Sequence, residues 1–263
     1  MRTLLTGECH ADNLFTLVDP TRFSEIEFEA EVHKALNCLM RNYWCRVFAG
    51  SFVHDGVRKM SDLVMVHREL SHWIVIEVEI AGHSLDGHVL PQVRCLRFGE
   101  PADTCVASLM NAFPEFNEYQ AKSVLAHVPR SAMVIANVRD PIWLHALRGL
   151  DTELLTVSIY EGSGGRRAYE LEGKVSVRQE SLGFAQFSAV YKSIKVPKQC
   201  KLPVGLVQIE DQFGNVGDWT VTEDVDTFWL TKNRGPALLT HNGYVQLIRN
   251  LDGRISLRPS TGS

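Results

Sequence analysis

The chain has 263 residues, 45% of them hydrophobic and 22% charged, which is enough to bury one large domain or a core domain with a smaller appendage. Its net charge of −4 gives no overall positive field, so contact with nucleic acid must come from local patches. No run reaches the roughly 18 apolar residues of a membrane helix, and the N-terminus lacks the apolar core of a signal peptide. The six cysteines are scattered, with no two separated by only two residues, which argues against a zinc knuckle or a disulfide framework. We therefore expect a cytoplasmic protein with reduced thiols and no membrane partner.

The first predicted element is an acidic helix. Ser24 has the position of an N-cap, and Glu27 completes a capping box three residues later. An apolar stripe at helical spacing extends the helix to about Met40. Its first half contains four glutamates, Glu25, Glu27, Glu29 and Glu31. Acidic residues near a helix N-terminus favour the macrodipole, which accounts for three of the four without any functional role.

A hairpin is predicted next, with strands over residues 43–53 and 57–66. Asp55-Gly56 between the two apolar runs is a typical hairpin turn. Asp62 lies inside the second strand, just before four apolar residues, although aspartate is disfavoured in strands. Either Asp62 marks a solvated strand start, or its carboxylate has a function.

Residues 73–80 form the next predicted strand, an apolar run that contains Glu77 and Glu79. Because side chains alternate along a strand, both carboxylates project from one face, with their Cα atoms about 7 Å apart. Buried carboxylates are unfavourable unless they are paired, hydrogen-bonded or bound to a cation. The alternative is an edge strand whose outer face is solvated. His83 would share the carboxylate face if the strand extended, but a loop histidine is more often solvated.

Helices and buried strands alternate from there to about residue 165. The expected helices span residues 90–98, 102–112, 116–127 and 141–150, and the expected strands span residues 131–138 and 154–160. This order predicts an α/β fold with a mixed sheet flanked by helices on both faces.

The remainder has a different character. Residues 166–190 alternate like a hairpin pair, and residues 191–203 form a lysine-rich connector. Short strands follow, with Asn242-Gly243 and Asp252-Gly253 as the clearest hairpin turns, which predicts a small all-β module. The predicted division is a core at residues 1–165, a hairpin and basic connector at 166–202, and the all-β module at 203–263.

Three carboxylates are expected to converge. Adjacent strands lie less than 5 Å apart, so Asp62 and Glu77 can meet at one end of the strand pair, beside Glu79. Converging carboxylates repel one another, and one stays protonated unless a cation lies between them. Oxygen ligands suit a hard ion, Mg²⁺ or Mn²⁺, which can polarise a phosphate and activate water.

This pattern resembles the PD-(D/E)xK nuclease superfamily, the fold of many restriction endonucleases and Holliday-junction resolvases. The matching stretches are residues 28–36, 61–64 and 75–79, and the order of elements matches the family core over roughly residues 24–160. The resemblance implies a restriction-endonuclease-like fold and a metal-dependent deoxyribonuclease that hydrolyses phosphodiester bonds. By analogy of fold alone it also suggests defence against foreign DNA.

The resemblance also implies roles for single residues. Asp62 and Glu77 are the expected metal ligands, and Glu29 most resembles the helix glutamate of the family, with Glu31 as the alternative. Glu79 stands where the family usually has the lysine that positions or deprotonates the attacking water. Some restriction enzymes of this superfamily carry glutamate there and remain active. The exchange suggests a carboxylate base or a more acidic metal site.

DNA contacts are expected on the helix over residues 90–98. Gln92 resembles the glutamine that some members place near the active site, although Leu96 stands where an aromatic residue often follows it. Arg94 and Arg97 are the predicted phosphate contacts. The connector lysines are the alternative, although a solvated linker is the favoured explanation for those. DNA is thus the expected partner, and a homodimer is left open.

Three classes of function compete. The first is a magnesium-dependent DNA endonuclease. The second is a catalytically inactive nuclease fold kept as a DNA-binding or dimerisation module, because the lysine is missing. The third is a glycosidase, whose carboxylates face each other across about 5–10 Å, usually from separate loops rather than one strand. A plasmid-nicking assay with Mg²⁺, Mn²⁺ or EDTA discriminates among them.

Overall fold

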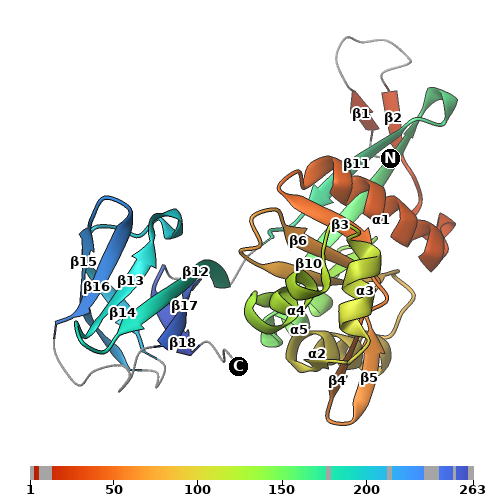
Figure 1. Cartoon of the computed structure of the whole chain (residues 1–263). Helices are drawn as coiled ribbons and strands as arrows, with labels where there is room; N and C mark the ends of the chain where they lie inside the picture. The colour runs from red at the N-terminus through yellow and green to blue at the C-terminus, as the bar shows by residue number, and fades with distance from the viewer. Residues whose placement is uncertain are drawn as a thin grey trace. The chain divides into compact units, whose positions relative to one another are not determined.

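The computed structural model describes residues 3–5, 14–175, 179–211, 215–233, 243–250 and 253–259 (Figure 1). The chain forms two compact units. The first comprises Met1–Arg68, Trp73–Leu125 and Arg130–Ser176, and the second comprises Glu69–His72, Ala126–Pro129 and Val177–Ser263. The first unit combines helices and strands, whereas the second contains a strand barrel, so the predicted α/β class with an all-β module is confirmed. Within the described residues, every helix is too short or too polar to traverse a bilayer.

An eight-stranded mixed sheet forms the centre of the first unit. Its order is β1-β2-β10-β9-β7-β6-β3, with β11 paired to β10. The strands are β1 (Thr3–Leu5), β2 (Leu14–Leu17), β3 (Tyr43–Val47), β6 (Leu63–His67), β7 (Trp73–Glu79), β9 (Arg130–Ala136), β10 (Glu153–Gly162) and β11 (Arg167–Glu172). Strands β7, β9 and β10 run parallel, whereas β3, β6 and β7 form an antiparallel meander. β7 therefore lies inside the sheet, between β6 and β9.

Helices cover both faces of this sheet. They are α1 (Glu25–Leu39), α2 (Leu90–Phe98), α3 (Cys105–Ala112), α4 (Glu118–His127) and α5 (Pro141–Gly149), and α1 begins with the predicted Ser24–Glu27 capping box. Phe28 of α1 packs in one core with Ile76 and Ile135. Val93 of α2 packs in another core with Val134, the neighbour of Ile135 in the sequence. Since neighbouring strand residues point to opposite faces, α1 and α2 lie on opposite sides of the sheet.

The predicted hairpin is divided between two sheets. β4 (Ser51–His54) and β5 (Val57–Met60) pair across the Asp55-Gly56 turn, whose two residues have φ of 48° and 76°. With β8 (Glu100–Pro101) they form a separate three-stranded sheet. The turn is thus confirmed, but the two uninterrupted strands over 43–53 and 57–66 were wrong.

The interruption has a local cause at Ser61. Its hydroxyl accepts a hydrogen bond from Ile76 N at 3.1 Å and lies 2.9 Å from Ile76 O, to which Asp62 N also donates over 3.2 Å, so a side chain takes part in the pairing there. Asp62 therefore stands directly before β6 rather than within a strand.

The second unit contains a closed barrel of seven strands in the order β12-β13-β16-β15-β14-β18-β17. They are β12 (Gln179–Ser188), β13 (Ser193–Pro197), β14 (Gly205–Glu210), β15 (Val216–Glu223), β16 (Thr227–Lys232), β17 (Gly243–Asn250) and β18 (Ile255–Pro259). Trp219, Phe187 and Leu247 are buried in its core. The turn residues Asn242 and Asp252 lie outside the described residues.

The boundary between the units differs from the predicted division at residues 165 and 202. β11 pairs with β10 of the first unit, and β12 and β13 are barrel strands, so residues 166–190 do not form a hairpin. Part of the predicted basic connector is β13, in which Ile194 and Val196 are buried and Lys195 is exposed. The high lysine content of this segment suggested a linker, although Ile194 and Val196 alternate with Lys195 as in a strand.

Candidate metal centre

Asp62 and Glu77 meet where the β6–β7 pair ends. The register ends where Leu63 pairs with Ile76, and Asp62 N donates to Ile76 O over 3.2 Å, so Asp62 lies at the end of the pair next to the residue that precedes Glu77. Val78 N donates to Asp62 Oδ2 over 2.8 Å, which turns the aspartate carboxylate towards β7. The backbone thus brings Asp62 to the strand that carries Glu77 and Glu79.

Glu77 and Glu79 are almost completely buried, with 2% and 0% of their surface exposed. They face the side of the sheet that α2 covers, because Ile76 and Val78 belong to the core under α1. Gln92 Nε2 donates to Glu77 Oε1, whereas Glu77 Oε2 and Glu79 Oε1 are buried without a hydrogen-bond partner. The alternative of a solvated edge strand was therefore wrong.

Burial dominates the electrostatics of the three acids. It raises the pKa of Glu77 to about 10, and the nearby Asp62 charge adds to the effect. The pKa of Asp62 rises to about 7 by burial, against the opposing hydrogen bond from Val78, with the charge of Glu29 contributing. Burial also raises the pKa of Glu79, while its hydrogen bond to His83 and the charge of His88 lower it. A cation among these carboxylates would stabilise their ionised forms.

The helix glutamates separate into different environments. Burial and the charge of Glu25 raise the pKa of Glu29, and the charges of Glu29 and Glu25 both contribute to the raised pKa of Asp62. Glu31 instead accepts hydrogen bonds from Tyr169 Oη and Lys34 Nζ, both at 2.7 Å. The structure thus places Glu29 near the site and turns Glu31, the alternative, to other partners.

The three predicted DNA contacts on α2 also differ. Besides Glu77, Gln92 Nε2 contacts Met60 O at 3.1 Å, so Gln92 is an integral part of the acidic site. Arg94 is exposed. Arg97, in the last turn of the helix, forms a 3.0 Å ion pair with Asp151. The structure therefore brings only Gln92 to the carboxylates.

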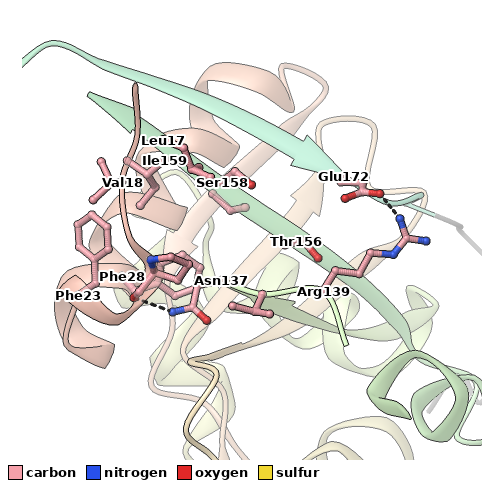
Figure 2. A pocket seen from close by; sticks show the side chains of 13 residues that line it. Leu17, Val18, Phe23, Phe28, Asn137, Arg139, Thr156, Ser158, Ile159 and Glu172 are labelled. Carbon is pink, nitrogen blue, oxygen red and sulfur yellow. Dashed lines mark hydrogen bonds and ion pairs between the residues drawn. The ribbon is translucent and has the colours of Figure 1, made fainter. Parts of the chain in front are cut away.

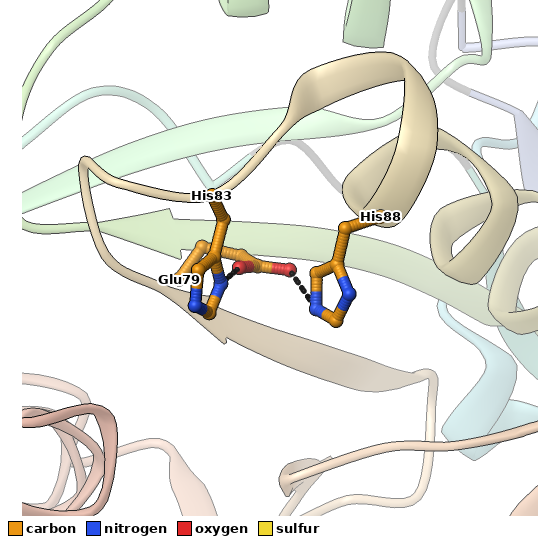
Figure 3. A group of neighbouring side chains, drawn as sticks. All are labelled: Glu79, His83 and His88. Carbon is orange, nitrogen blue, oxygen red and sulfur yellow. Dashed lines mark hydrogen bonds and ion pairs between the residues drawn. The ribbon is translucent and has the colours of Figure 1, made fainter.

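Two histidines complete the surroundings of Glu79 (Figure 3). His83 Nδ1 contacts Glu79 Oε2, and His88 Nε2 lies 3.4 Å from Glu79 Oε1, so one imidazole faces each oxygen. His83 follows β7 in a loop, and His88 belongs to a π-helical turn, η3 (Leu85–Val89), that leads into α2. His83 is thus not merely solvated, and His88 was missed altogether. The sequence signal that could have indicated this cluster is the short spacing of its members. His83 follows Glu79 by four residues, and His88 follows His83 by five.

The loop that carries His83 is fixed by a distant residue, Asn137. Ala81 N donates to Asn137 Oδ1 over 2.9 Å, and Asn137 Nδ2 donates to Pro20 O over 3.1 Å. Ser84 Oγ then accepts from Gly87 N and caps η3. Asn137 follows β9, which lies beside β7, and nothing in its local sequence indicates this role.

Asn137 also lines a separate pocket of about 190 Å³ near the start of α1 (Figure 2). Val18, Phe23 and Phe28 form much of its wall, and Arg139 pairs with Glu172 at one side. None of the three central carboxylates lines this pocket. We therefore place the candidate site at the acids.

Comparisons of the chain with protein-family models, curated proteins and solved structures find no match.

Proposed function

We propose that this chain is a metal-dependent DNA endonuclease of the PD-(D/E)xK type, with Asp62 and Glu77 as ligands of Mg²⁺ or Mn²⁺. The observation that carries the proposal is the meeting of three carboxylates at one end of a buried strand pair, two of which have buried oxygens without hydrogen-bond partners. Such oxygens are strongly unfavourable in a protein interior unless a proton or a cation compensates them.

The donor set fits a hard cation. Asp62 and Glu77 offer carboxylate oxygens, which Mg²⁺ and Mn²⁺ prefer over nitrogen and sulfur. The free atom Glu77 Oε2 is a ready ligand, because Gln92 occupies only the other oxygen of that carboxylate. When bound, the ion supplies polarisation of a phosphate and a more acidic water molecule.

The surrounding residues position these ligands. Val78 N orients the carboxylate of Asp62, and Gln92 orients that of Glu77. Glu29 adds a negative charge that increases the attraction of the site for a cation. Glu79 stands at the position of the family lysine, and its contacts with His83 and His88 favour a metal-binding role over that of a free base.

A second candidate is a nuclease fold without catalytic activity that binds DNA or dimerises. The observation that favours it is the same glutamate, because Glu79 cannot supply the positive charge of a lysine. As a DNA-binding module it would differ from the first candidate only in leaving phosphodiester bonds intact, and as a dimerisation module it would not need DNA.

A nicking assay on supercoiled plasmid tests the proposal. We expect nicking with Mg²⁺ or Mn²⁺, none in EDTA, and a loss of more than about 100-fold in Asp62→Asn and Glu77→Gln. Glu118→Gln is the matched control, since Glu118 forms an exposed ion pair with Lys122 on α4. A parent protein that binds DNA but never nicks it would select the second candidate. A parent protein that neither nicks nor binds DNA and is monomeric in solution would overturn both.

A further inference from the structure

We propose that Glu79, His83 and His88 bind a first-row transition-metal ion, for which Zn²⁺ is the probe, at a site distinct from the hard-ion ligands Asp62 and Glu77. The inference does not depend on DNA cleavage, because a catalytically inactive nuclease fold could hold the same ion.

The geometry of the three side chains suits such an ion. One ligand atom from each residue can be chosen so that all three atoms lie within 4.8 Å of one another. The 3.4 Å between His88 Nε2 and Glu79 Oε1 is about the separation of two ligands bound at ~2.1 Å to a tetrahedral ion. Figure 3 shows the carboxylate between the two imidazole rings, whose centroids are 4.8 Å apart.

The carboxylate itself provides an independent observation. Glu79 has no exposed surface, and its Oε1 atom has no hydrogen-bond partner. This atom faces His88 across a distance longer than a hydrogen bond. An ion between them would compensate the buried oxygen and would use the lone pair of the imidazole nitrogen.

An outer layer of contacts supports the proposed ligands. Glu25 Oε2 lies 3.7 Å from His83 Nε2, while His83 Nδ1 faces Glu79. At this distance Glu25 places a negative charge near the ring of His83 and makes no hydrogen bond to it. Asn137 and Ser84 fix the backbone on either side of His83 through their contacts with Ala81 and Gly87.

The chemistry of the donors selects the class of ion. Two imidazoles and one carboxylate suit Zn²⁺, Fe²⁺ or Ni²⁺, whereas Mg²⁺ and Mn²⁺ prefer oxygen ligands. Three protein ligands leave a further coordination position open, as in catalytic zinc sites. If the proposed nuclease function also holds, this ion would supply positive charge at the position of the family lysine.

Metal titration of the full chain tests the inference. The protein is stripped with a chelator, and Zn²⁺ binding is measured by calorimetry and by metal analysis in the presence of excess Mg²⁺. We expect one tightly bound Zn²⁺ per chain, with affinity lowered by about 100-fold or more in His83→Gln and in His88→Gln. His145→Gln is the matched control, because His145 is exposed on α5.

Two further measurements make the outcome decisive. Co²⁺ should give the visible absorption of a low-coordinate site in the parent and not in the double variant His83→Gln/His88→Gln, whose fold is checked by circular dichroism. Asp62→Asn should keep its Zn²⁺ binding, because Asp62 is not one of the three proposed ligands. A parent protein that binds Zn²⁺ but does not cleave DNA would refute only the proposed endonuclease function. Equal Zn²⁺ affinity of the parent and the folded double variant, or no binding by the parent, would overturn the inference.

Discussion

Asp62 and Glu77 lie at the same end of the β6–β7 pair, and the charge of Asp62 adds to burial in raising the pKa of Glu77. Asp62 is anchored by Val78 N, whereas Glu77 is held by Gln92 from α2. Two elements of the chain thus converge on one acidic pair. This relationship makes the site sensitive to metal, to pH and to single neutral substitutions.

Asp62→Asn should separate stability from activity. The amide removes a buried negative charge next to Glu77, so the metal-free variant should be at least as stable as the parent. Mg²⁺ at 100 times its dissociation constant should stabilise the parent by about 2.7 kcal/mol, and the variant by much less. Thermal unfolding with and without Mg²⁺ measures both effects. Cleavage and a melting shift like those of the parent would show that Asp62 is only a solvated strand start.

Glu77 should make the metal-free protein less stable as the pH rises. Its pKa is raised by burial from 4.5 to about 10, so the unfolded chain binds fewer protons than the folded one between these values. The contribution of Glu77 to the free energy of unfolding is therefore highest below about pH 4.5. It falls as the pH rises towards 10, by at most about 1.4 kcal/mol per pH unit. Glu77→Gln should flatten the profile in urea titrations between pH 5 and 9. Parallel profiles for the two proteins would contradict the assignment.

Gln92→Ala should destabilise the protein, although the Gln92 side chain is only partly buried on α2. The change leaves Glu77 Oε1 buried without its donor, a loss of about 1–3 kcal/mol in the free energy of unfolding. Arg94→Ala on the same helix is the control, because Arg94 is exposed and should change little. Chemical denaturation compares the two. If both variants unfold at the same denaturant concentration, the Gln92–Glu77 contact does not stabilise the fold.

Arg94 and Arg97 are the predicted phosphate contacts, and their double replacement by alanine should weaken DNA binding independently of sequence. Each lost contact should lower the slope of log affinity against log salt by about 0.9. Arg97 is paired with Asp151, so Arg94→Ala alone should account for most of the change. Fluorescence anisotropy at several salt concentrations measures the slope. An unchanged slope would place the DNA elsewhere, with Lys195 and its neighbours as the next residues to replace.

Local rules in the sequence determined several parts of this protein. The Ser24–Glu27 capping box begins α1, and the Asp55-Gly56 turn closes the β4–β5 hairpin. The two-residue spacing of Glu77 and Glu79 places both carboxylates on one strand face, as alternation requires. These features depend on residues within a few positions of one another, so the sequence alone was sufficient to predict them.

Only the tertiary structure decided what surrounds those carboxylates. His83 and His88 reach Glu79 because the intervening loop is held by Asn137, which is 56 residues from its partner Ala81. Gln92 meets Glu77 because α2 packs back on the sheet, and Lys195 lies on a barrel strand because Ile194 and Val196 fill a core shared with distant strands. Such contacts depend on packing between remote segments, and neither spacing nor composition encodes their distances.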